Sequence, residues 1–541
     1  MDYPLTLPAL ARRAEQVNAA RGVAWRRPDG SLGATSWGAV LGRARRLAVA
    51  LQGLGIGPGD TVATFCWNHR EHLEAYYAAP ALGAVLHTLN IRLHADELAY
   101  IANHAGDRIV IADASLLPQL EAFRERAPFK HVVLVGAGGP GEPPLPAWAI
   151  GYEELLARVP GEAPAWDDLP GAGVDERDPA TCCYTSGTTG MPKGVLLSHR
   201  GVVLHALTSC TADSFALSQR DSALAVVPMF HVNAWGLPFS CAMTGAKMVL
   251  PGPRLDAASL LELIEHEGVT MSAGVPTVFL PLLTALDEAA AAGAPRDVRT
   301  LRSLVIGGSA APQALIEGFQ ERHGVEVVHA WGMTELGPIG TIGRVPARLD
   351  GASAAERYRY RAKQGRPVAN VEVRAVGDDG LVPWDGESFG ELEVRGTSVI
   401  SAYTSAEGAD RFSGDGWFRT GDIVTIDPDG TIEIRDRAKD LIKSGGEWIS
   451  SVALENALMG HPAVAEAAVV AIADERWGER PLACVVLRPG AAATAEELRA
   501  HLEPSFARWW LPERFAFVDA IPRTATGKFK KTALREQFGS A

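Results

Sequence analysis

Apolar residues in the first part of the chain alternate between helical spacing and short continuous runs. A helical pattern over residues 43–54 is followed by the turn Gly57-Pro58-Gly59-Asp60 and by an apolar run at 61–65. The same alternation returns between residues 223 and 329, with strands predicted at 224–227, 269–272, 301–306 and 325–329 and a helix at 257–267. Alternating strands and helices predict α/β architecture with a mostly parallel, layered sheet.

The pattern changes twice towards the C-terminus. From residue 365 to 434, short alternating runs separated by Asp-Gly turns predict antiparallel strands. Beyond Asp436 the chain predicts a compact α+β unit, with a helix at 452–458, a strand at 467–470 and a helix capped by Thr494. We therefore place a domain boundary at Asp436, which divides the chain into residues 1–436 and 437–541. Gly/Pro-rich stretches at 136–146 and 160–173 predict surface loops.

Composition narrows the class of protein. A chain of 541 residues is too long for a single hydrophobic core, so two or more domains are expected. A net charge of −13 argues against a nucleic-acid partner, because binding nucleic acid needs clustered Lys and Arg. No run approaches eighteen apolar residues, and the first residues lack the basic and apolar regions of a signal peptide, so no integral membrane segment and a soluble, cytoplasmic protein are expected. The six cysteines show no spacing typical of a metal site and are expected to be reduced.

One segment indicates phosphate binding. Residues 184–194, Tyr-Thr-Ser-Gly-Thr-Thr-Gly-Met-Pro-Lys-Gly, place three glycines, four Ser/Thr hydroxyls and one lysine between two apolar runs. Glycines allow backbone N–H groups to face an anion. The segment is not a Walker A loop, because Lys193 is followed by Gly rather than Ser or Thr.

Four further segments carry polar residues in a recognisable order. They are His329-Ala330-Trp331-Gly332-Met333-Thr334-Glu335, Phe418-Arg419-Thr420-Gly421-Asp422, the charged stretch 435–447, and Pro522-Arg523-Thr524-Ala525-Thr526-Gly527-Lys528. Together with residues 184–194, they resemble the motifs of the adenylate-forming superfamily of acyl-CoA synthetases, luciferases and peptide-synthetase adenylation domains. The resemblance covers essentially the whole chain. It implies a large N-terminal domain of layered α/β sheets with a β-barrel-like part and a small, mobile α+β C-terminal domain.

The resemblance assigns roles around ATP. The expected catalytic residues are Lys193, His231, Thr334, Glu335 and Lys528. Thr334 is expected at the α-phosphate, Glu335 and Thr188 at Mg²⁺, and Asp422 at both ribose hydroxyls. Lys528 is expected to bridge the acid's carboxylate and the α-phosphate. Trp331 stands where the family usually has tyrosine and is expected beside adenine. The remaining residues expected to bind ATP or AMP are Thr185, Ser186, Gly187, Thr189, Gly190, Gly308, Ser309, Ala330, Gly332, Met333, Ile434 and Arg437.

The acid and the thiol acceptor are inferred in the same way. In the family's amino-acid activators an aspartate follows the phenylalanine of the segment that corresponds to 228–231, but here His231 follows Phe230, which disfavours an amino-acid substrate. His231, Val232, Trp235, Gly307 and Ile339 are the expected acyl pocket, with Trp235 as a gate or a fixed floor. Asp436 is the expected hinge. The expected CoA tunnel residues are Lys443, Gly445 and Gly446.

The main hypothesis is therefore an AMP-forming acyl-CoA synthetase. The segment 230–235 looks especially like the long- and medium-chain fatty acyl-CoA synthetases and the methylthiopropanoate-CoA ligases. The implied co-substrates are an aliphatic carboxylic acid, ATP with Mg²⁺, and CoA, and the resemblance implies a homodimer. Three alternatives stay open: a ligase for a short or sulfur-containing acid such as 3-methylthiopropanoate, a non-catalytic acyl-adenylate or ATP sensor, and a luciferase-type oxygenase.

Overall fold

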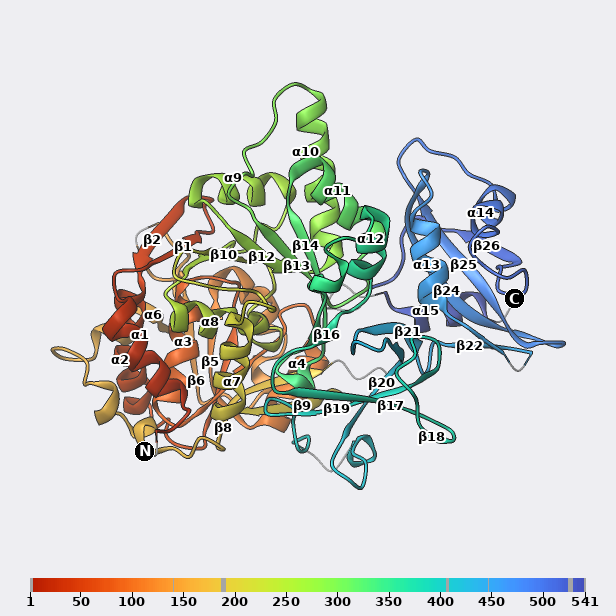
Figure 1. Ribbon diagram of the computed structural model, residues 1–541. Coiled ribbons are helices and arrows are strands. Elements are labelled where there is room, and N and C mark those ends of the chain that lie inside the picture. Colours follow the sequence, from red (N-terminus) through yellow and green to blue (C-terminus); the bar gives the residue numbers. More distant parts are fainter. Residues whose placement is uncertain are drawn as a thin grey trace.

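The computed structural model describes residues 3–139, 141–185, 191–404, 408–445, 447–523 and 529–539. The predicted residues Ser186, Gly187, Thr188, Thr189, Gly190, Gly446 and Lys528 lie outside this description. Within it, the molecule has a large body that carries the N-terminus and a smaller C-terminal unit beside it (Figure 1). No helix in the described residues combines the length and hydropathy needed to cross a membrane.

Two sheets form the frame of the large body. In the described residues, nine strands make the larger sheet in the order β16-β15-β14-β13-β12-β10-β11-β1-β2, and seven make the other in the order β7-β6-β5-β3-β4-β8-β9. Neighbouring strands from β14 to β1 run parallel, as the sequence predicted. The strands of the larger sheet are Gly22–Arg26 (β1), Leu32–Ser36 (β2), Ser222–Ala225 (β10), Lys247–Leu250 (β11), Met271–Gly274 (β12), Ser303–Ile306 (β13), Glu326–Gly332 (β14), Ile339–Ile342 (β15) and Arg366–Pro367 (β16). Those of the other sheet are Thr61–Phe65 (β3), Val85–Thr88 (β4), Asp107–Asp113 (β5), His131–Val135 (β6), Ile150–Gly151 (β7), Pro179–Thr185 (β8) and Lys193–Ser198 (β9).

Helices cover both sheets in layers. The largest core cluster joins the two sheets to the helices between them, which are Leu7–Asn18 (α1), Trp37–Gly53 (α2), Arg70–Ala81 (α3), His199–Cys210 (α7) and Leu237–Thr244 (α8). A second cluster lies under Ala257–Glu267 (α9), Pro276–Ala291 (α10) and Gln313–His323 (α11), on the outer face of the larger sheet. A third cluster places Ala95–Ala105 (α4) and Leu117–Glu121 (α5) on the outer face of the seven-stranded sheet. Tyr152–Ala157 (α6) packs against α2, and Ala354–Ala362 (α12) packs against α11. The predicted α/β fold class is confirmed.

A small antiparallel sheet stands where the sequence predicted antiparallel strands. Its order is β18-β17-β19-β20-β21. The strands are Val371–Gly377 (β17), Gly380–Leu381 (β18), Phe389–Gly396 (β19), Phe418–Ile426 (β20) and Ile432–Arg437 (β21). Asp436 belongs to β21 and pairs with Ile423 of β20. It therefore lies near the end of the last strand of this sheet, where the chain continues into the C-terminal unit.

The C-terminal unit has its own cores. Its sheet consists of Ile442–Ser444 (β22), Glu447–Ile449 (β23), Val464–Asp474 (β24), Gly478–Leu487 (β25) and Arg514–Phe517 (β26). Ser451–Met459 (α13) and Ala495–Leu502 (α14) pack on one face, and Lys531–Phe538 (α15) packs on the other. Thr494 caps α14 together with Glu497, as predicted. These separate cores are consistent with the proposed division at Asp436.

One predicted loop differs in detail. The stretch 160–173 contains the short 3₁₀ helices Trp166–Asp168 (η3) and Pro170–Gly173 (η4), with Trp166 and Leu169 buried. Two apolar side chains among the prolines and glycines are enough to fold this loop onto the core. All six cysteines are free, five of them buried and Cys210 half-buried, as the sequence predicted.

Candidate active site

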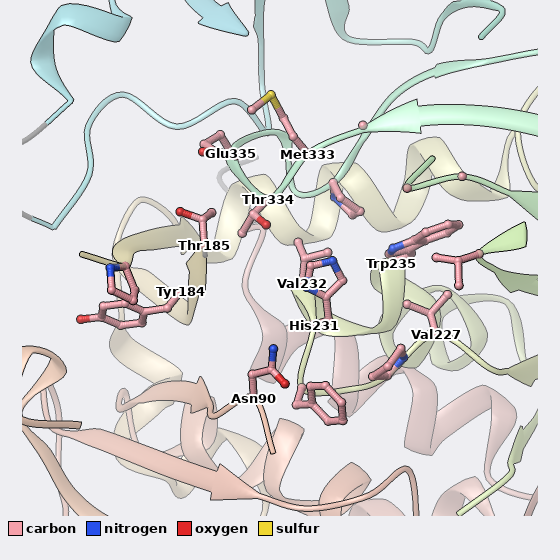
Figure 2. A pocket seen from close by; sticks show the side chains of 18 of the residues that line it. Asn90, Tyr184, Thr185, Val227, His231, Val232, Trp235, Met333, Thr334 and Glu335 are labelled. Carbon is pink, nitrogen blue, oxygen red and sulfur yellow. The ribbon is translucent and has the colours of Figure 1, made fainter. Parts of the chain in front are cut away.

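A cavity of about 420 Å³ lies where the large body meets the first residues of the C-terminal unit. The predicted residues that line it are Thr185, Lys193, His231, Val232, Trp235, Gly307, Gly308, Ala330, Trp331, Gly332, Met333, Thr334, Glu335, Ile339 and Arg437. In Figure 2, Thr185 and Thr334 lie together near Glu335, while Trp235 and Val227 lie on the other side of His231 and Val232. The cavity therefore has a polar end and an apolar end.

The polar end is built where β14 stops. Gly332 ends the strand, and a Cβ at this position would lie 2.0 Å from the carbonyl oxygen of Pro338, so only glycine allows this close approach. Thr334 and Glu335 follow in the 3₁₀ helix η6 (Thr334–Leu336), and their side chains are buried, with 7% and 6% exposure. The strand thus places a hydroxyl and a carboxylate next to each other at the cavity.

Tyr403 holds the carboxylate of Glu335. Its hydroxyl donates to Glu335 Oε1 at 2.7 Å, and its ring lies 5.4 Å below the ammonium nitrogen of Lys193. Burial and the neighbouring carboxylate raise the pKa of Tyr403, so the phenol stays protonated and acts as a donor. Sequence reasoning missed Tyr403, because it lies 68 residues from Glu335 and outside every recognised motif.

A second carboxylate is held by an aromatic residue and an arginine. Trp331 Nε1 donates to Asp422 Oδ2 at 2.9 Å, and Arg437 Nε lies 2.6 Å from Asp422 Oδ1. Asp422 is 1% exposed, while Trp331 and Arg437 line the cavity. Gly340 makes room for the indole, since a Cβ there would lie 2.4 Å from Trp331 Cζ3. Each carboxylate oxygen carries two lone pairs, so Asp422 retains acceptor capacity for further donors.

The apolar end contains an unusual backbone segment. Val232, Asn233, Ala234, Trp235 and Gly236 all have positive φ, between 35° and 79°, and form a buried left-handed turn. This conformation costs about 1–2 kcal/mol for each residue other than glycine. Asn233 ties the turn to β8, because its Nδ2 donates to Thr181 Oγ1 at 3.0 Å. Strain of this kind concentrates at functional sites.

The turn places Trp235 against glycines. A Cβ on Gly307 would lie 3.1 Å from Trp235 Cη2, and one on Gly308 would lie 4.0 Å from Trp235 Cζ2. The indole is 7% exposed and faces the cavity together with Val227, Val275 and Val278. An aliphatic chain fits such a lining.

Some predicted residues stand outside the cavity lining. Asp422, Ser309 and Ile434 are not among the described lining residues, Asp422 because it is buried behind Trp331 and Arg437. Asp436 is fully buried, and its carboxylate accepts from Ser451 N at 2.6 Å and from Ser451 Oγ at 2.7 Å. Lys443 and Gly445 lie on and next to β22, away from the cavity, where Gly445 N donates to the carbonyl oxygen of Trp477. Conversely, Arg92, Arg411, Lys439, Asp440 and Phe529 line the cavity and were not predicted.

Two helix-covered sheets thus frame one cavity with a polar end and an apolar end, which suits an enzyme that binds a polar and an apolar substrate together. The chain belongs to the AMP-binding enzyme family. The family described as "AMP-binding enzyme" matches residues 11–404, and the one described as "AMP-binding enzyme C-terminal domain" matches residues 453–528.

Relatives and solved structures agree with this family. The chain is 48% identical to a long-chain-fatty-acid–CoA ligase of Thermus thermophilus, over 99% of this chain and 96% of that protein. It is 43% identical to a 3-methylmercaptopropionyl-CoA ligase of Ruegeria lacuscaerulensis, over 100% and 98%, and 44% identical to a medium-chain-fatty-acid–CoA ligase of Ectopseudomonas oleovorans, over 100% and 97%. A crystal structure of an anthranilate CoA ligase with anthranoyl-AMP superposes with a TM-score of 0.85 at 26% identity, covering 99% of this chain and 98% of that one. The family and the class of enzyme predicted from the sequence are confirmed.

Proposed function

We propose that this chain is an ATP-dependent acid–CoA ligase for an aliphatic carboxylic acid, of medium or long chain length. It forms an acyl-AMP and pyrophosphate from the acid and ATP, and CoA then displaces AMP to give the thioester. The observation that carries the proposal is the single cavity that joins Thr334 and Glu335 to the apolar lining around Trp235.

In the adenylation step, the apolar end holds the aliphatic tail and directs the carboxylate towards His231 and Thr334. Asp422, held by Trp331 and Arg437, accepts hydrogen bonds from the ribose hydroxyls. Thr334 donates to the α-phosphate. By resemblance, Lys528 bridges the carboxylate and the α-phosphate.

Glu335 is the residue proposed to hold Mg²⁺. No group of three His, Cys, Asp or Glu that suits a metal exists among the described residues. A single carboxylate fits Mg²⁺, because this ion is usually bound by one or two carboxylates together with substrate phosphates. When bound, Mg²⁺ offsets the negative charge that develops on the phosphates.

The thioester step requires a different arrangement of the C-terminal domain, 437–541. Lys443 and Gly445, the proposed CoA tunnel residues, stand apart from the cavity, whereas Lys439, Asp440 and Phe529 line it. We infer that the domain turns about Asp436 after adenylation, which withdraws Lys528 and brings Gly445 to the cavity. Such a movement also keeps water from the labile acyl-AMP. A homodimer and a cytoplasmic location belong to the same proposal and rest on the resemblance alone.

A second candidate acid is 3-methylthiopropanoate. The relative from Ruegeria lacuscaerulensis that carries the corresponding name matches over the full length of this chain. One methylene contributes only about 0.8 kcal/mol to burial, so an apolar pocket ranks neighbouring chain lengths weakly. A non-catalytic sensor has no need for the proposed lysine of adenylation and is therefore the weaker hypothesis.

The test is pyrophosphate release by the purified enzyme with ATP and Mg²⁺, across linear acids of increasing length and 3-methylthiopropanoate, with and without CoA. A CoA-stimulated maximum at one length supports the ligase and identifies its acid. No release with any acid contradicts it and favours the sensor.

The Lys528→Ala variant tests the two-step mechanism. It is expected to lower the rate of adenylation by about 10²–10³, since a preorganised donor to developing charge is lost. Thioester formation from supplied acyl-AMP is expected to change far less. Equal losses in both half-reactions would contradict the proposed movement of the domain.

A further inference from the structure

One wall of the cavity is a segment without regular structure. Residues 226–231, here called the acyl wall, connect the end of β10 to the left-handed turn, and Val226, Val227, Pro228, Phe230 and His231 line the cavity. Most of the acyl wall is buried. Its backbone N–H and C=O groups therefore need partners from elsewhere in the chain.

Asn68 supplies two of these partners, and a third contact to Ala225 at the end of β10, from the seven-stranded half of the molecule. Its Nδ2 donates to the carbonyl oxygens of Ala225 at 2.8 Å and Val227 at 2.9 Å, and its Oδ1 accepts from Met229 N at 2.7 Å. The side chain is 4% exposed. Two carbonyl partners on one side and an N–H on the other fix the orientation of the amide.

Tyr76 completes the contact at the same residue. Its hydroxyl donates to the carbonyl oxygen of Met229, and the side chain is fully buried on α3. Both backbone polar groups of Met229 are thus bound by side chains that precede it by more than 150 positions. The position of the acyl wall thus depends on Asn68 and Tyr76, together with one bond to β12, from Val227 N to the carbonyl oxygen of Ala273 at 3.1 Å.

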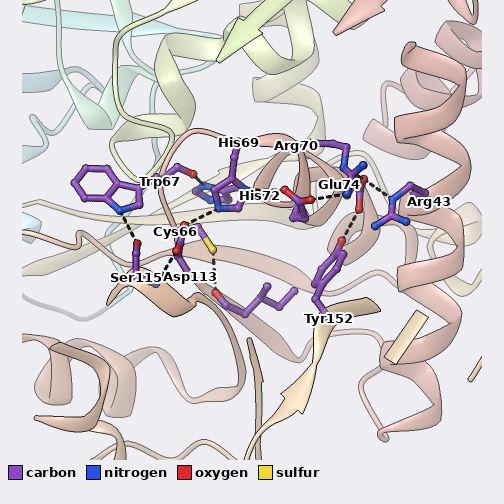
Figure 3. Close-up of polar contacts among 12 residues, drawn as sticks. Arg43, Cys66, Trp67, His69, Arg70, His72, Glu74, Asp113, Ser115 and Tyr152 are labelled. Atoms are coloured by element: carbon purple, nitrogen blue, oxygen red, sulfur yellow. Dashed lines mark hydrogen bonds and ion pairs between the residues drawn. The ribbon is translucent and has the colours of Figure 1, made fainter. Parts of the chain in front are cut away.

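The residues next to Asn68 belong to a polar network, and Figure 3 shows Trp67, His72 and Ser115 within it. His72 Nδ1 lies 3.0 Å from the carbonyl oxygen of Trp67, and its Nε2 lies 2.9 Å from Thr64 Oγ1. Burial lowers the pKa of His72 to about 3, so the ring is neutral and one nitrogen donates while the other accepts. Trp67 Nε1 also donates to Ser115 Oγ at 3.2 Å. Hydrogen bonds of the neighbouring residues therefore hold the loop that carries Asn68 in place.

A second cavity, of about 10 Å³ and thus the size of one water molecule, adjoins the acyl wall. Trp67, Asn68 and Gly252 line it, and it shares the acyl-wall residues Val226, Pro228 and Phe230 with the main cavity. Replacing Asn68 by Ala removes the hydrogen bonds to the wall and adds the volume of the amide group to this small space. The acyl wall then shifts away from the main cavity and lengthens the pocket.

We propose that Asn68, supported by Tyr76, is a positioning residue that sets the shape of the acyl pocket and so the preferred chain length of the acid. The role rests on the proposed function, because it concerns the acid pocket of that reaction. Asn68 touches neither ATP nor the reacting carboxylate. Its loss changes the binding of the acid and leaves the binding of ATP as it is.

The chain offers a matched pair of variants. Tyr76 and Tyr77 are adjacent on α3 and almost completely buried, and each donates its hydroxyl to a backbone carbonyl oxygen. The partner of Tyr76 is Met229 in the acyl wall, whereas that of Tyr77 is Pro238 in α8, which does not line the described cavity. Tyr77→Phe therefore controls for the loss of one buried hydrogen bond.

The experiment compares wild type, Asn68→Ala, Tyr76→Phe and Tyr77→Phe. We expect KM for the preferred acid to rise about tenfold in Asn68→Ala and about threefold in Tyr76→Phe, with KM for ATP unchanged and the length profile shifted to longer acids. Tyr77→Phe should keep the wild-type profile. If Asn68→Ala does not fold, Tyr76→Phe carries the test.

Hydrogen exchange of the backbone amides at 226–231 gives a readout that needs no activity. Faster exchange in Asn68→Ala and Tyr76→Phe, but not in Tyr77→Phe, is expected. Unchanged exchange together with an unchanged acid profile overturns the positioning role. Wild-type enzyme that releases no pyrophosphate with any acid contradicts the proposed function instead, and exchange alone then decides whether Asn68 holds the acyl wall.

Discussion

Glu335 lines the cavity and Asp422 is buried behind two of its lining residues, and an aromatic side chain orients each of these carboxylates. Trp331 donates to Asp422, and Tyr403 donates to Glu335. Hydrogen bonds to charged groups contribute about 1.5–3 kcal/mol, more than bonds between neutral groups. At the scale of single residues, removal of the Trp331 donor should weaken the binding of ATP, and removal of the Tyr403 donor should weaken the binding of Mg²⁺.

Replacement of Trp331 by Phe removes the donor to Asp422 but keeps an aromatic ring in the cavity. We expect KM for ATP to rise about tenfold, because Asp422 is less firmly held for the ribose. Pyrophosphate release measured against ATP concentration checks this. Trp37→Phe is the matched control, since Trp37 is fully buried and donates to the carbonyl oxygen of Ala246. An unchanged KM for ATP in Trp331→Phe would contradict the proposal that Trp331 orients Asp422 for the ribose.

Replacement of Tyr403 by Phe leaves Glu335 without its phenol donor. The expected result is an increase of about tenfold in the Mg²⁺ concentration that gives half-maximal adenylation, because the carboxylate is free to turn. Titration with Mg²⁺ at saturating ATP measures it. Tyr360→Phe serves as the control, since its hydroxyl pairs with Thr431 Oγ1 at 2.8 Å away from the described cavity. Equal Mg²⁺ requirements in both variants would contradict the assignment.

At the scale of elements, the left-handed turn that carries Trp235 is the clearest departure from ordinary backbone geometry. Ala234 has φ 49° and is fully buried. Its conformation suits glycine better than alanine. The turn persists because Asn233 binds Thr181 and because the segment is packed between the two sheets.

Paired substitutions to glycine measure this strain. Ala234→Gly and Ala225→Gly each remove one fully buried methyl group and add the same freedom to the unfolded chain, but Ala225 lies in the strand β10. We expect Ala234→Gly to be less destabilising than Ala225→Gly by about 1–2 kcal/mol, the strain that glycine relieves. Urea unfolding of both variants gives the comparison. Equal losses of stability would mean that the turn is not strained.

The sequence predicted most elements at this scale. Helix 257–267 is α9, and the helix predicted at 452–458 is α13, one residue longer at each end. Such elements are predictable because their apolar spacing and capping residues are local. The turn at 232–236 was not predicted, since only Asn233 and Gly236 are of residue types that favour positive φ, while Val232, Ala234 and Trp235 are not. Likewise, nothing local links Asn68 to Met229, which it contacts only because two separate sheets pack together.

For the whole molecule, buried histidines connect stability to pH. Burial lowers the pKa of His72 to about 3 and those of His199, His205 and His329 to about 4, below the ordinary value of 6.5. These side chains stay neutral in the folded protein, while the unfolded chain takes up protons below pH 6.5. Their stabilising contribution is complete above pH 6.5 and is lost as pH falls towards 4.

His205 allows a direct measurement of this effect. Its Nε2 accepts from Ile339 N at 3.2 Å, which requires the neutral ring. Between pH 6.5 and 5.0, one such group removes about 2 kcal/mol from the free energy of unfolding, at about 1.4 kcal/mol per pH unit. His205→Gln should therefore lose about 2 kcal/mol less than wild type over this range in urea unfolding. A wild-type slope in His205→Gln would show that His205 does not titrate in this way.

The sequence by itself determined the layered α/β class, the antiparallel region, the family and part of the cavity lining, including Thr334 and Glu335. It did so because strand and helix periodicity are local and because a Gly-rich loop and the Thr-Glu pair occur within short motifs. Only the tertiary structure decided which side chains hold Asp422, Glu335 and the acyl wall in place. The bonds from Trp331 to Asp422, from Tyr403 to Glu335 and from Asn68 to the acyl wall join residues far apart in the chain, and they form only when the strands and helices that carry them pack against each other.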